Sequence, residues 1–235
     1  MTDKPSPPHI IMTRPRAASE RFLAALGAKR LAIGRAVISP AISIEQFEAP
    51  VDLDGFSGVI VTSSNALAGV SAAPGLTAWC VGDATAEAAA RAGFEAVSTG
   101  GTADDLLGVV SRAQPRGSLL YLRGRHVNSD LAERLAAEGV DVAERVVYDQ
   151  PECAPTEEAR ALLAEMHPVI LPLFSPRTAR IVAGWAAVAA APTVAVAMSE
   201  QVAEAWGGKA RVAGRPTVEA MVGAVAELIV ETGNG

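Results

Sequence analysis

The chain has 235 residues, of which 50% are hydrophobic and 20% charged, and this composition excludes an intrinsically disordered protein. The formal net charge of -6 at pH 7 argues against a nucleic-acid-binding protein, which would present a basic face. One hydrophobic core is hard to fill much beyond about 200 residues, so the length fits either one large domain or two domains of about 100 residues each.

Short β-branched segments alternate along the chain with alanine-rich helical segments. The expected strand and helix pairs, in chain order, are 9–12 with a helix that ends at Gly27, 58–61 with 65–70, 78–81 with 85–92, 118–122 with 129–138, 169–174 with 177–185 and 193–198 with 201–206, and a last helix covers 217–231. Gly27, Gly93 and Gly139 are expected as C-caps. The pattern predicts the α/β class, with open parallel sheets covered by helices on both faces.

Four motifs occur twice. TSSNALAGV around Ser63 resembles FSPRTARIVAGW around Ser175, VGDATAEA around Gly82 resembles MSEQVAEA around Ser199, GTADDLLGVV around Thr102 resembles PTVEAMVGAV around Thr217, and LRGRHVNSDLAERLAAEG around Arg123 resembles TRPRAASERFLAALG around Arg14. By subtraction, the first three pairs are 112, 117 and 115 residues apart and the fourth is 109 apart. A chance likeness explains any single pair, but four pairs at nearly one offset indicate a duplicated half.

The order of the motifs predicts two similar domains, one of them discontinuous. Residues 1–41 and 153–235 are expected to form one α/β domain, and residues 48–144 an inserted one. The connecting segments 42–47 and 145–152 are expected to form a two-stranded β-ladder that acts as a hinge. The β-rich segments GRAVIS (34–39) and ERVVYD (144–149) correspond to each other and are expected to pair in that ladder.

The cysteine content and the absence of long apolar segments point to a cytoplasmic protein. Cys80 and Cys153 cannot form a disulfide framework, and neither has a histidine or cysteine neighbour at metal-ligand spacing. The first fifteen residues lack the apolar stretch of a secretory signal. The uncharged stretches 55–82 and 181–199 are broken by polar residues or proline, so no membrane span is expected.

Hydroxyl, glycine and arginine residues follow the expected strands, where open parallel sheets bind ligands. They are Thr13 and Arg14, Thr62 to Ser64, Gly82 to Thr85, Gly101 and Thr102, Arg123 to Arg125, Ser175 to Arg177, and Ser199. Amide groups at helix starts, with arginines beside them, suit carboxylate or phosphate. Two facing domains would then hold a large polyanion in a cleft. Each hydroxyl taken alone is better explained as an N-cap, whereas each arginine is equally well explained as a solvated surface charge.

Tyr148 stands out because it lies in a connecting strand, although spacing alone favours a packing role for it. His9, His126 and His167 show no partner spacing, and neither cysteine has the partners of a catalytic nucleophile. The glycine-rich nucleotide motifs and the zinc and serine-hydrolase motifs are missing. A reaction without cofactor or metal on a polyanionic substrate is therefore the reading left open.

Several of these segments together resemble the uroporphyrinogen-III synthase family. They are TRP (13–15), VTSSNAL (61–67), VGDATA (81–86), GTADDLL (101–107), LYLRG (120–124), VVYD (146–149), LFSPRTA (173–179) and PTVEAMV (216–222). The resemblance implies two α/β domains joined by a β-ladder. It also implies a lyase that cyclises hydroxymethylbilane, a linear tetrapyrrole polycarboxylate, to uroporphyrinogen III, with inversion of the last ring, loss of water and no cofactor. A cytoplasmic monomer is the default expectation.

The resemblance also implies functional residues. Tyr148 occupies the position of the family's tyrosine and becomes the candidate proton donor. Thr62, Ser63, Ser64, Thr85, Gly101, Thr102, Ser175 and Ser199 become substrate contacts, beside Thr13, Arg14 and Arg123 from the strand-end argument. The chain departs from the family after residue 198, where many members have G-P-T-T-A and this chain has SEQVA.

Two other readings share most of these features. One is a two-domain protein that binds a polycarboxylate or tetrapyrrole without chemistry, which would give Tyr148 no task. The other is a catalytically silent relative that serves as a partner of tetrapyrrole enzymes. The isomer formed from hydroxymethylbilane distinguishes the enzyme from both.

Overall fold

The structure, a computed structural model, describes residues 6–72, 75–126 and 130–234. These residues form two compact units. Unit 1 contains the described residues up to Ser43 and those from Glu152 onward, and unit 2 contains Ile44–Pro151. Unit 1 is therefore assembled from two separate parts of the chain.

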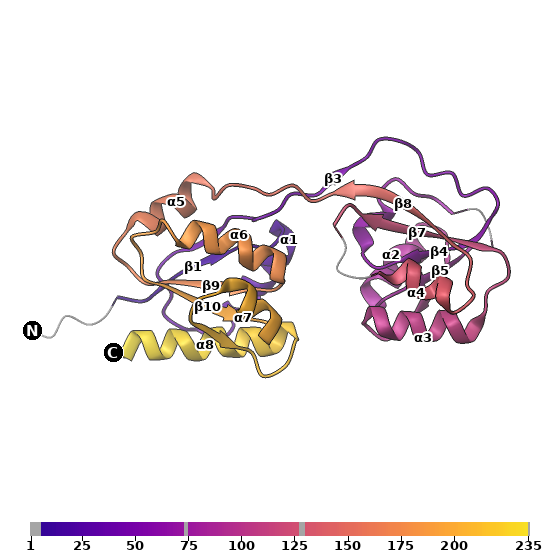
Figure 1. The fold of residues 1–235 in the computed structure, drawn as a ribbon. Coiled ribbons are helices and arrows are strands. Elements are labelled where there is room, and N and C mark those ends of the chain that lie inside the picture. Colours follow the sequence, from indigo (N-terminus) through magenta and orange to yellow (C-terminus); the bar gives the residue numbers. More distant parts are fainter. Residues whose placement is uncertain (1–5, 73–74, 127–129, 235) are drawn as a thin grey trace, which may run out of the picture. The chain divides into compact units, whose positions relative to one another are not determined.

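Unit 1 is a parallel five-stranded sheet with the strand order β11-β10-β9-β1-β2 (Figure 1). Its elements in chain order are β1 (His9–Met12), α1 (Arg16–Gly27), β2 (Ala36–Ile38), α5 (Glu157–Ala164), β9 (Val169–Leu173), α6 (Pro176–Ala186), β10 (Thr193–Ala197), α7 (Glu200–Trp206), β11 (Ala210–Val212) and α8 (Val218–Asn234). Apolar side chains of α5, α6 and α7 pack on one face of the sheet, and those of α1 and α8 pack on the other. Burial on both faces explains why the strands are continuously hydrophobic.

Unit 2 contains a six-stranded sheet with the order β3-β8-β7-β4-β5-β6. Its elements are β3 (Glu45–Gln46), β4 (Phe56–Val61), the 3₁₀ helix η1 (Ser64–Leu67), β5 (Thr77–Cys80), α2 (Asp83–Arg91), β6 (Glu95–Ser98), α3 (Ala103–Ala113), β7 (Ser118–Gly124), α4 (Leu131–Ala137) and β8 (Val142–Asp149). Only β3 runs antiparallel to its neighbour. The segment η1 and helix α2 cover one face, and α3 and α4 cover the other.

The two sheets have the same topology. The order β11-β10-β9-β1-β2 of unit 1 corresponds to β6-β5-β4-β7-β8 of unit 2. Ile10 pairs with Ile170 in the first sheet, and Leu119 pairs with Gly58 in the second, which reproduces the offsets of 109 and 112 residues found in the sequence. The predicted fold class, two similar α/β domains with parallel sheets, is confirmed.

The connecting segments pair differently from the prediction. Residues 36–38 of GRAVIS form β2, which pairs with β1, whereas β8 pairs with β7. The two segments complete separate parallel sheets, because a buried strand needs a backbone partner along its length. The register matches 36–38 with 142–144, not with the end of ERVVYD. The antiparallel ladder consists of β3 with Tyr148 and Asp149, and of a bridge between Ile42 and Glu152. That it bends as a hinge stays a prediction.

Other differences concern short elements. The helix expected at 65–70 is the single turn η1, which Ser63 caps. Helix α1 ends at Gly27 as expected, but the C-cap is Ala28 in helical conformation and not a left-handed glycine. The start of the helix expected from Ser129 lies outside the described residues. The prediction omitted β6, β11 and α5, whose short or charged segments carry little apolar periodicity. In the described part of the chain, no helix is long and apolar enough to cross a membrane.

Candidate functional site

The strand ends of unit 1 bring four predicted residues to one edge of its sheet. Thr13 and Arg14 follow β1, Ser175 comes soon after β9, and Ser199 comes soon after β10. These three strands are parallel neighbours, so the four residues share the carboxyl edge, where such sheets bind ligands. We call this set of four the unit 1 rim.

Arg14 presents a half-buried guanidinium that rests on an aromatic ring. Its Cζ lies 4.3 Å from the centroid of the Phe174 ring, and Phe174 meets Phe22 edge-on. Burial, and to a lesser degree the charge of Arg21, lower the pKa of Arg14 from its ordinary value. Among the described residues, no carboxylate forms an ion pair with Arg14. A partly desolvated cation without a counter-ion is suited to bind the carboxylate of a ligand.

The three hydroxyls of the unit 1 rim differ in how they are used. Ser175 caps α6: its Oγ accepts a hydrogen bond from the Thr178 amide at 3.2 Å. Thr13 is fully buried, and its Oγ1 has no hydrogen-bond partner in the described part of the chain. Ser199 precedes α7 without capping it through the side chain, and the exposed Glu200 adds a negative charge directly after it. The hydroxyl of Ser175 is therefore explained as a helix N-cap, whereas that of Thr13 is not.

Tyr148 occupies the end of β8 in unit 2, with its side chain in the core formed with η1 and α2. The residue is only 6% exposed. Burial raises the pKa of its phenol, and a side-chain hydrogen bond with Ser63 acts in the opposite direction. Tyr148 therefore holds its proton at neutral pH.

The second tyrosine of the chain, Tyr121 on β7, is held in the same way on the opposite face of the sheet. Its hydroxyl lies 3.2 Å from Oγ1 of Thr62, and burial raises its pKa. Thr62 and Ser63 are consecutive after β4: Thr62 lies at hydrogen-bond distance from the Tyr121 hydroxyl, and Ser63 contributes to the pKa of Tyr148. The predicted site residues Thr62, Ser63 and Tyr148 are brought together here.

Arg123 is placed at the edge of unit 2 but is already paired. Its Nε donates a hydrogen bond to Glu144 Oε1 at 2.7 Å, and its Nη1 donates to the Gly124 carbonyl at 3.1 Å. Arg123 thus already has a carboxylate partner that offsets its charge, unlike Arg14 among the described residues.

The remaining predicted contacts of unit 2 lie around the starts of α2 and α3. Thr85 is in the first turn of α2, whose first amides have no intrahelical acceptor. Gly101 has a φ of +120°, a conformation that favours glycine, and lies close to Gly82 at the start of α2. Thr102 caps α3 in a capping box with Asp105, so its side chain is occupied. Ser64, the first residue of η1, is exposed.

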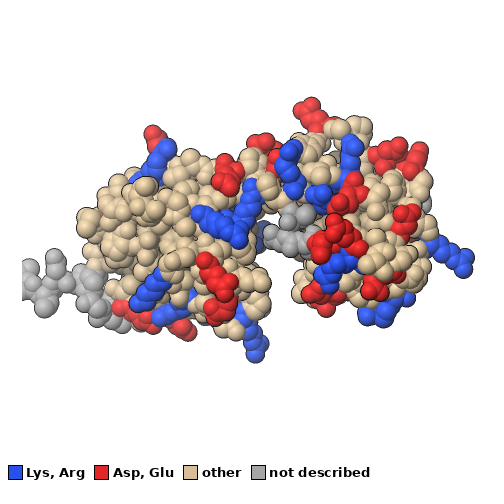
Figure 2. Space-filling model, viewed as in Figure 1, with Lys and Arg blue, Asp and Glu red and all other residues tan. Residues whose placement is uncertain are grey.

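Carboxylates also lie at this edge of unit 2. Asp83 accepts a hydrogen bond from Ser98 at 2.6 Å, and Asp104 forms an ion pair with Arg134 at 2.8 Å. Figure 2 shows acidic and basic side chains interspersed on the visible face of unit 2, without a basic field. An anionic ligand at this edge of unit 2 would therefore be bound by local amides and hydroxyls and not by a basic field.

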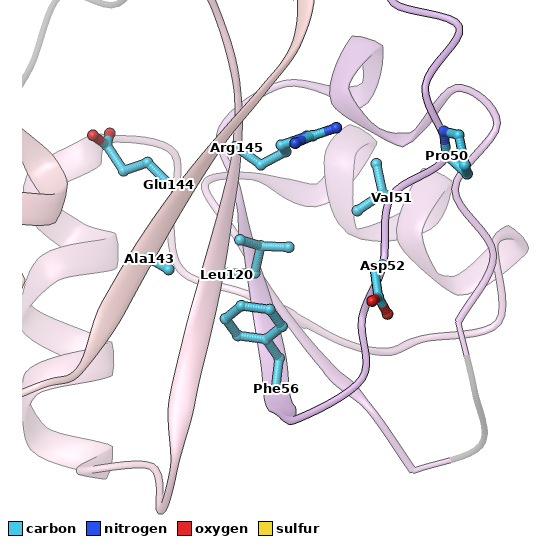
Figure 3. Close-up of a pocket in the computed structure, with 8 residues that line it drawn as sticks. All are labelled: Pro50, Val51, Asp52, Phe56, Leu120, Ala143, Glu144 and Arg145. Atoms are coloured by element: carbon cyan, nitrogen blue, oxygen red, sulfur yellow. The ribbon is translucent and has the colours of Figure 1, made fainter.

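A pocket of about 280 Å³ in unit 2 lies away from these residues. Its wall includes Phe56 from the start of β4, Leu120 from β7 and Arg145 from β8, and the Arg145 side chain extends toward the segment that contains Pro50 and Val51 (Figure 3). None of the predicted site residues lines it. In the described residues, no group of three or more histidine, cysteine or acidic side chains is placed to hold a metal ion.

The sequence reading missed two residues that the structure places at the strand ends. Tyr121 positions Thr62, and Phe174 supports Arg14. Both belong to quoted motifs, LYLRG and LFSPRTA, and Tyr121 is one of only two tyrosines in the chain. Their place in these motifs and the rarity of tyrosine were signals that could have pointed to them. The contacts that Tyr121 and Phe174 make depend on which strands are neighbours, which the motifs do not show.

Comparison with protein families gives one match. The family model described as uroporphyrinogen-III synthase HemD (HEM4) matches residues 24–223. Among curated proteins, none matches the chain at a significant level.

Two solved structures show the same fold. Uroporphyrinogen-III synthetase from Helicobacter pylori is similar with a TM-score of 0.68 and 19% identity, over 94% of this chain and 99% of that one. A mutant uroporphyrinogen III synthase from Thermus thermophilus is similar with a TM-score of 0.53 and 17% identity, over 95% of this chain and 99% of that one. At these identities the likeness concerns the fold.

Proposed function

The chain belongs to the uroporphyrinogen-III synthase family of tetrapyrrole biosynthesis, whose members are cyclising enzymes of the lyase type, and from this premise we propose how its residues act. The proposed reaction is closure of hydroxymethylbilane to uroporphyrinogen III, with inversion of ring D and loss of water. Overall, this reaction breaks one carbon–oxygen bond and the carbon–carbon bond between ring D and its bridge carbon, and it forms two carbon–carbon bonds. The family match across residues 24–223 is the observation that carries this proposal.

Binding of the substrate's carboxylates supplies the first part of the activity. The acetate and propionate groups are proposed to bind the open amides at the starts of α2 and α7 and the guanidinium of Arg14. Holding the ends of a flexible chain close together converts conformational freedom into effective molarity, worth about 7–11 kcal/mol at best. The absence of a counter-ion for Arg14 among the described residues supports its part in this binding.

Tyr148 is proposed to supply the proton that the leaving group needs. The bond between the hydroxymethyl carbon and its oxygen breaks, the phenol proton moves to that oxygen, and water leaves an electrophilic azafulvene. The azafulvene carbon then bonds to the substituted α-carbon of ring D, and the bond from that α-carbon to the adjacent bridge carbon breaks. The freed bridge carbon bonds to the unsubstituted α-carbon of ring D, and the proton released there restores the phenol. The raised pKa of Tyr148 keeps the donor protonated at neutral pH.

The isomer composition of the product tests this function. Purified protein is supplied with freshly made hydroxymethylbilane, the product is oxidised, and the uroporphyrin isomers are separated. Type III is expected, whereas spontaneous closure gives type I. Recovery of type I alone would overturn the proposal and favour a binding protein without chemistry.

The location, the oligomeric state and the partners of the protein stay predictions. A cytoplasmic location, a monomeric state and the lack of nucleic-acid or membrane partners rest on the sequence alone. Cell fractionation and light scattering would check the first two.

A further inference from the structure

Gly124 lies in direct contact with the ring of Tyr148. A Cβ atom added at Gly124 would lie 2.7 Å from Cζ of Tyr148 and 2.9 Å from its hydroxyl oxygen. Carbon atoms in ordinary contact lie about 3.5–4.0 Å apart, so the ring occupies the space that a side chain at Gly124 would need. The contact involves the part of the ring that carries the hydroxyl group.

A β-bulge creates this contact. Arg123 pairs with Val146, but the next residue of β7, Gly124, pairs with Tyr148, so Val147 is an extra residue in β8. Without the bulge, Gly124 would face Val147 and Tyr148 would lie one position further along. The bulge leaves both Val147 and Tyr148 buried, at 7% and 6% exposure.

The ring of Tyr148 is held on several sides. Its side chain packs in the core with Leu122, and its carbonyl accepts a hydrogen bond from the Arg125 amide at 2.9 Å. An alanine at position 124 would have to push the ring outward by roughly 0.8 Å to reach ordinary contact. Such a movement displaces the hydroxyl group, because the closest contacts are to the end of the ring that carries it.

We propose that Gly124 is a positioning residue for the reaction, because its lack of a side chain lets the Tyr148 phenol sit against β7 and so fixes where its hydroxyl group lies. This inference rests on the proposed function for its effect on turnover, but the effect on the ring is independent of any activity. Gly124 is the last residue of β7, and a glycine in a strand often marks a bulge or a close approach of this kind.

The first test measures the ring directly. Protein labelled with 13Cζ-tyrosine gives two resonances, which Tyr121→Phe assigns. In Gly124→Ala the resonance of Tyr148 is expected to shift while that of Tyr121 stays. The matched control is Gly108→Ala on α3, where the added Cβ would meet only the end of a flexible arginine side chain. An unmoved Tyr148 resonance in folded Gly124→Ala overturns the inference.

The second test is kinetic. Gly124→Ala is expected to lower kcat about 100-fold with little change in KM, because a misplacement near 1 Å can cost about that factor. The double variant Gly124→Ala with Tyr148→Phe should have a kcat only slightly lower than that of Tyr148→Phe alone. If Tyr148→Phe leaves kcat unchanged, the proposed function of the phenol fails, not the positioning. If the fold-loss of kcat in the double variant equals the product of the two single fold-losses, the positioning role is contradicted.

A third variant tests the inference if Gly124→Ala fails to fold. If Gly124→Ala does not fold, removal of the ring in Gly124→Ala with Tyr148→Ala should restore folding to the level of Tyr148→Ala alone, as judged by circular dichroism and thermal melting. If the double variant remains unfolded while Tyr148→Ala folds, Gly124 is required for another reason and the inference is wrong.

Discussion

The two units share one sheet topology and one set of helix caps, but equivalent positions at their strand ends carry different chemistry. Arg14 in unit 1 corresponds to Arg123 in unit 2. Arg123 bonds to Glu144, whereas the register places Ile38 at the equivalent position beside β1, and Arg14 rests on Phe174 instead.

A second pair of positions differs in the same way. Thr62 and Tyr121, which share a hydrogen bond in unit 2, correspond to Phe174 and Met12 in unit 1. Duplication thus kept the scaffold and let the edges diverge. Unit 1 acquired an uncompensated cation on an apolar support, suited to bind an anion. Unit 2 acquired buried hydroxyls, suited to hold and deliver a proton.

Replacement of the proton donor should have the largest effect. Tyr148→Phe is expected to lower kcat by about 100- to 10,000-fold, the usual contribution of general acid catalysis, with little change in KM. Tyr121→Phe is the matched control, because it removes a buried hydroxyl from the same sheet without touching the proposed donor. Rates are measured with freshly made hydroxymethylbilane. Unchanged turnover in Tyr148→Phe removes this residue from the mechanism.

The two equivalent arginines should differ in their effect on substrate binding. Arg14→Ala is expected to raise KM about tenfold or more, because a hydrogen bond to a charged group contributes about 1.5–3 kcal/mol. Arg123→Ala should change KM much less, since that guanidinium is already satisfied by Glu144. Equal effects of the two substitutions would contradict the division between the units.

A carboxylate can be given to unit 1 at the position that corresponds to Glu144. In Ile38→Glu the new carboxylate should pair with Arg14 and raise KM by up to about tenfold, less than the loss of the arginine itself because such pairs are partly exposed. Ile38→Gln controls for the change of shape and polarity, and thermal melting checks the fold. A KM equal to that of the glutamine variant would show that Arg14 stays available.

Single hydroxyls at the helix starts should matter little. Thr85→Val is expected to change kcat/KM about threefold, the effect of one neutral hydrogen bond among many. Ser63→Ala should also be modest in substrate binding, with its effect seen mainly in kcat through Tyr148. Complete loss of activity from Thr85→Val would argue against binding distributed over several amides.

The smallest expected effect is a loss of stability of unit 2 at alkaline pH. It can be measured without substrate, and it distinguishes unit 2 from unit 1. Burial raises the pKa of the Cys80 thiol in unit 2 to about 11, from an ordinary value of 9.0. The folded state therefore holds this proton more tightly than the unfolded state, so the stabilisation is full below pH 9 and is lost as the pH rises toward 11. Hydrogen exchange should show unit 2 opening before unit 1 at pH 10, and Cys80→Ala should reduce that difference. Identical pH dependence in Cys80→Ala would contradict this origin.

The sequence by itself determined the α/β class, the duplication and the assembly of unit 1 from both ends of the chain. These follow from local patterns: β-branched strands, alanine-rich helices, and motifs such as those around Ser63 and Ser175 that recur at a nearly fixed offset. Most strand and helix positions were also within reach, because a buried strand or an amphipathic helix records its surroundings in its own residues.

Only the tertiary structure decided which candidates are still available to a ligand. Arg14 and Arg123 look alike in sequence, and their difference depends on which side chain the neighbouring strand places beside them, Ile38 or Glu144. The contact of Gly124 with Tyr148 likewise depends on one extra residue in β8. Local patterns record burial, but ion pairs and ring contacts arise between strands that are distant in the chain, and a shift of register by one residue changes every partner.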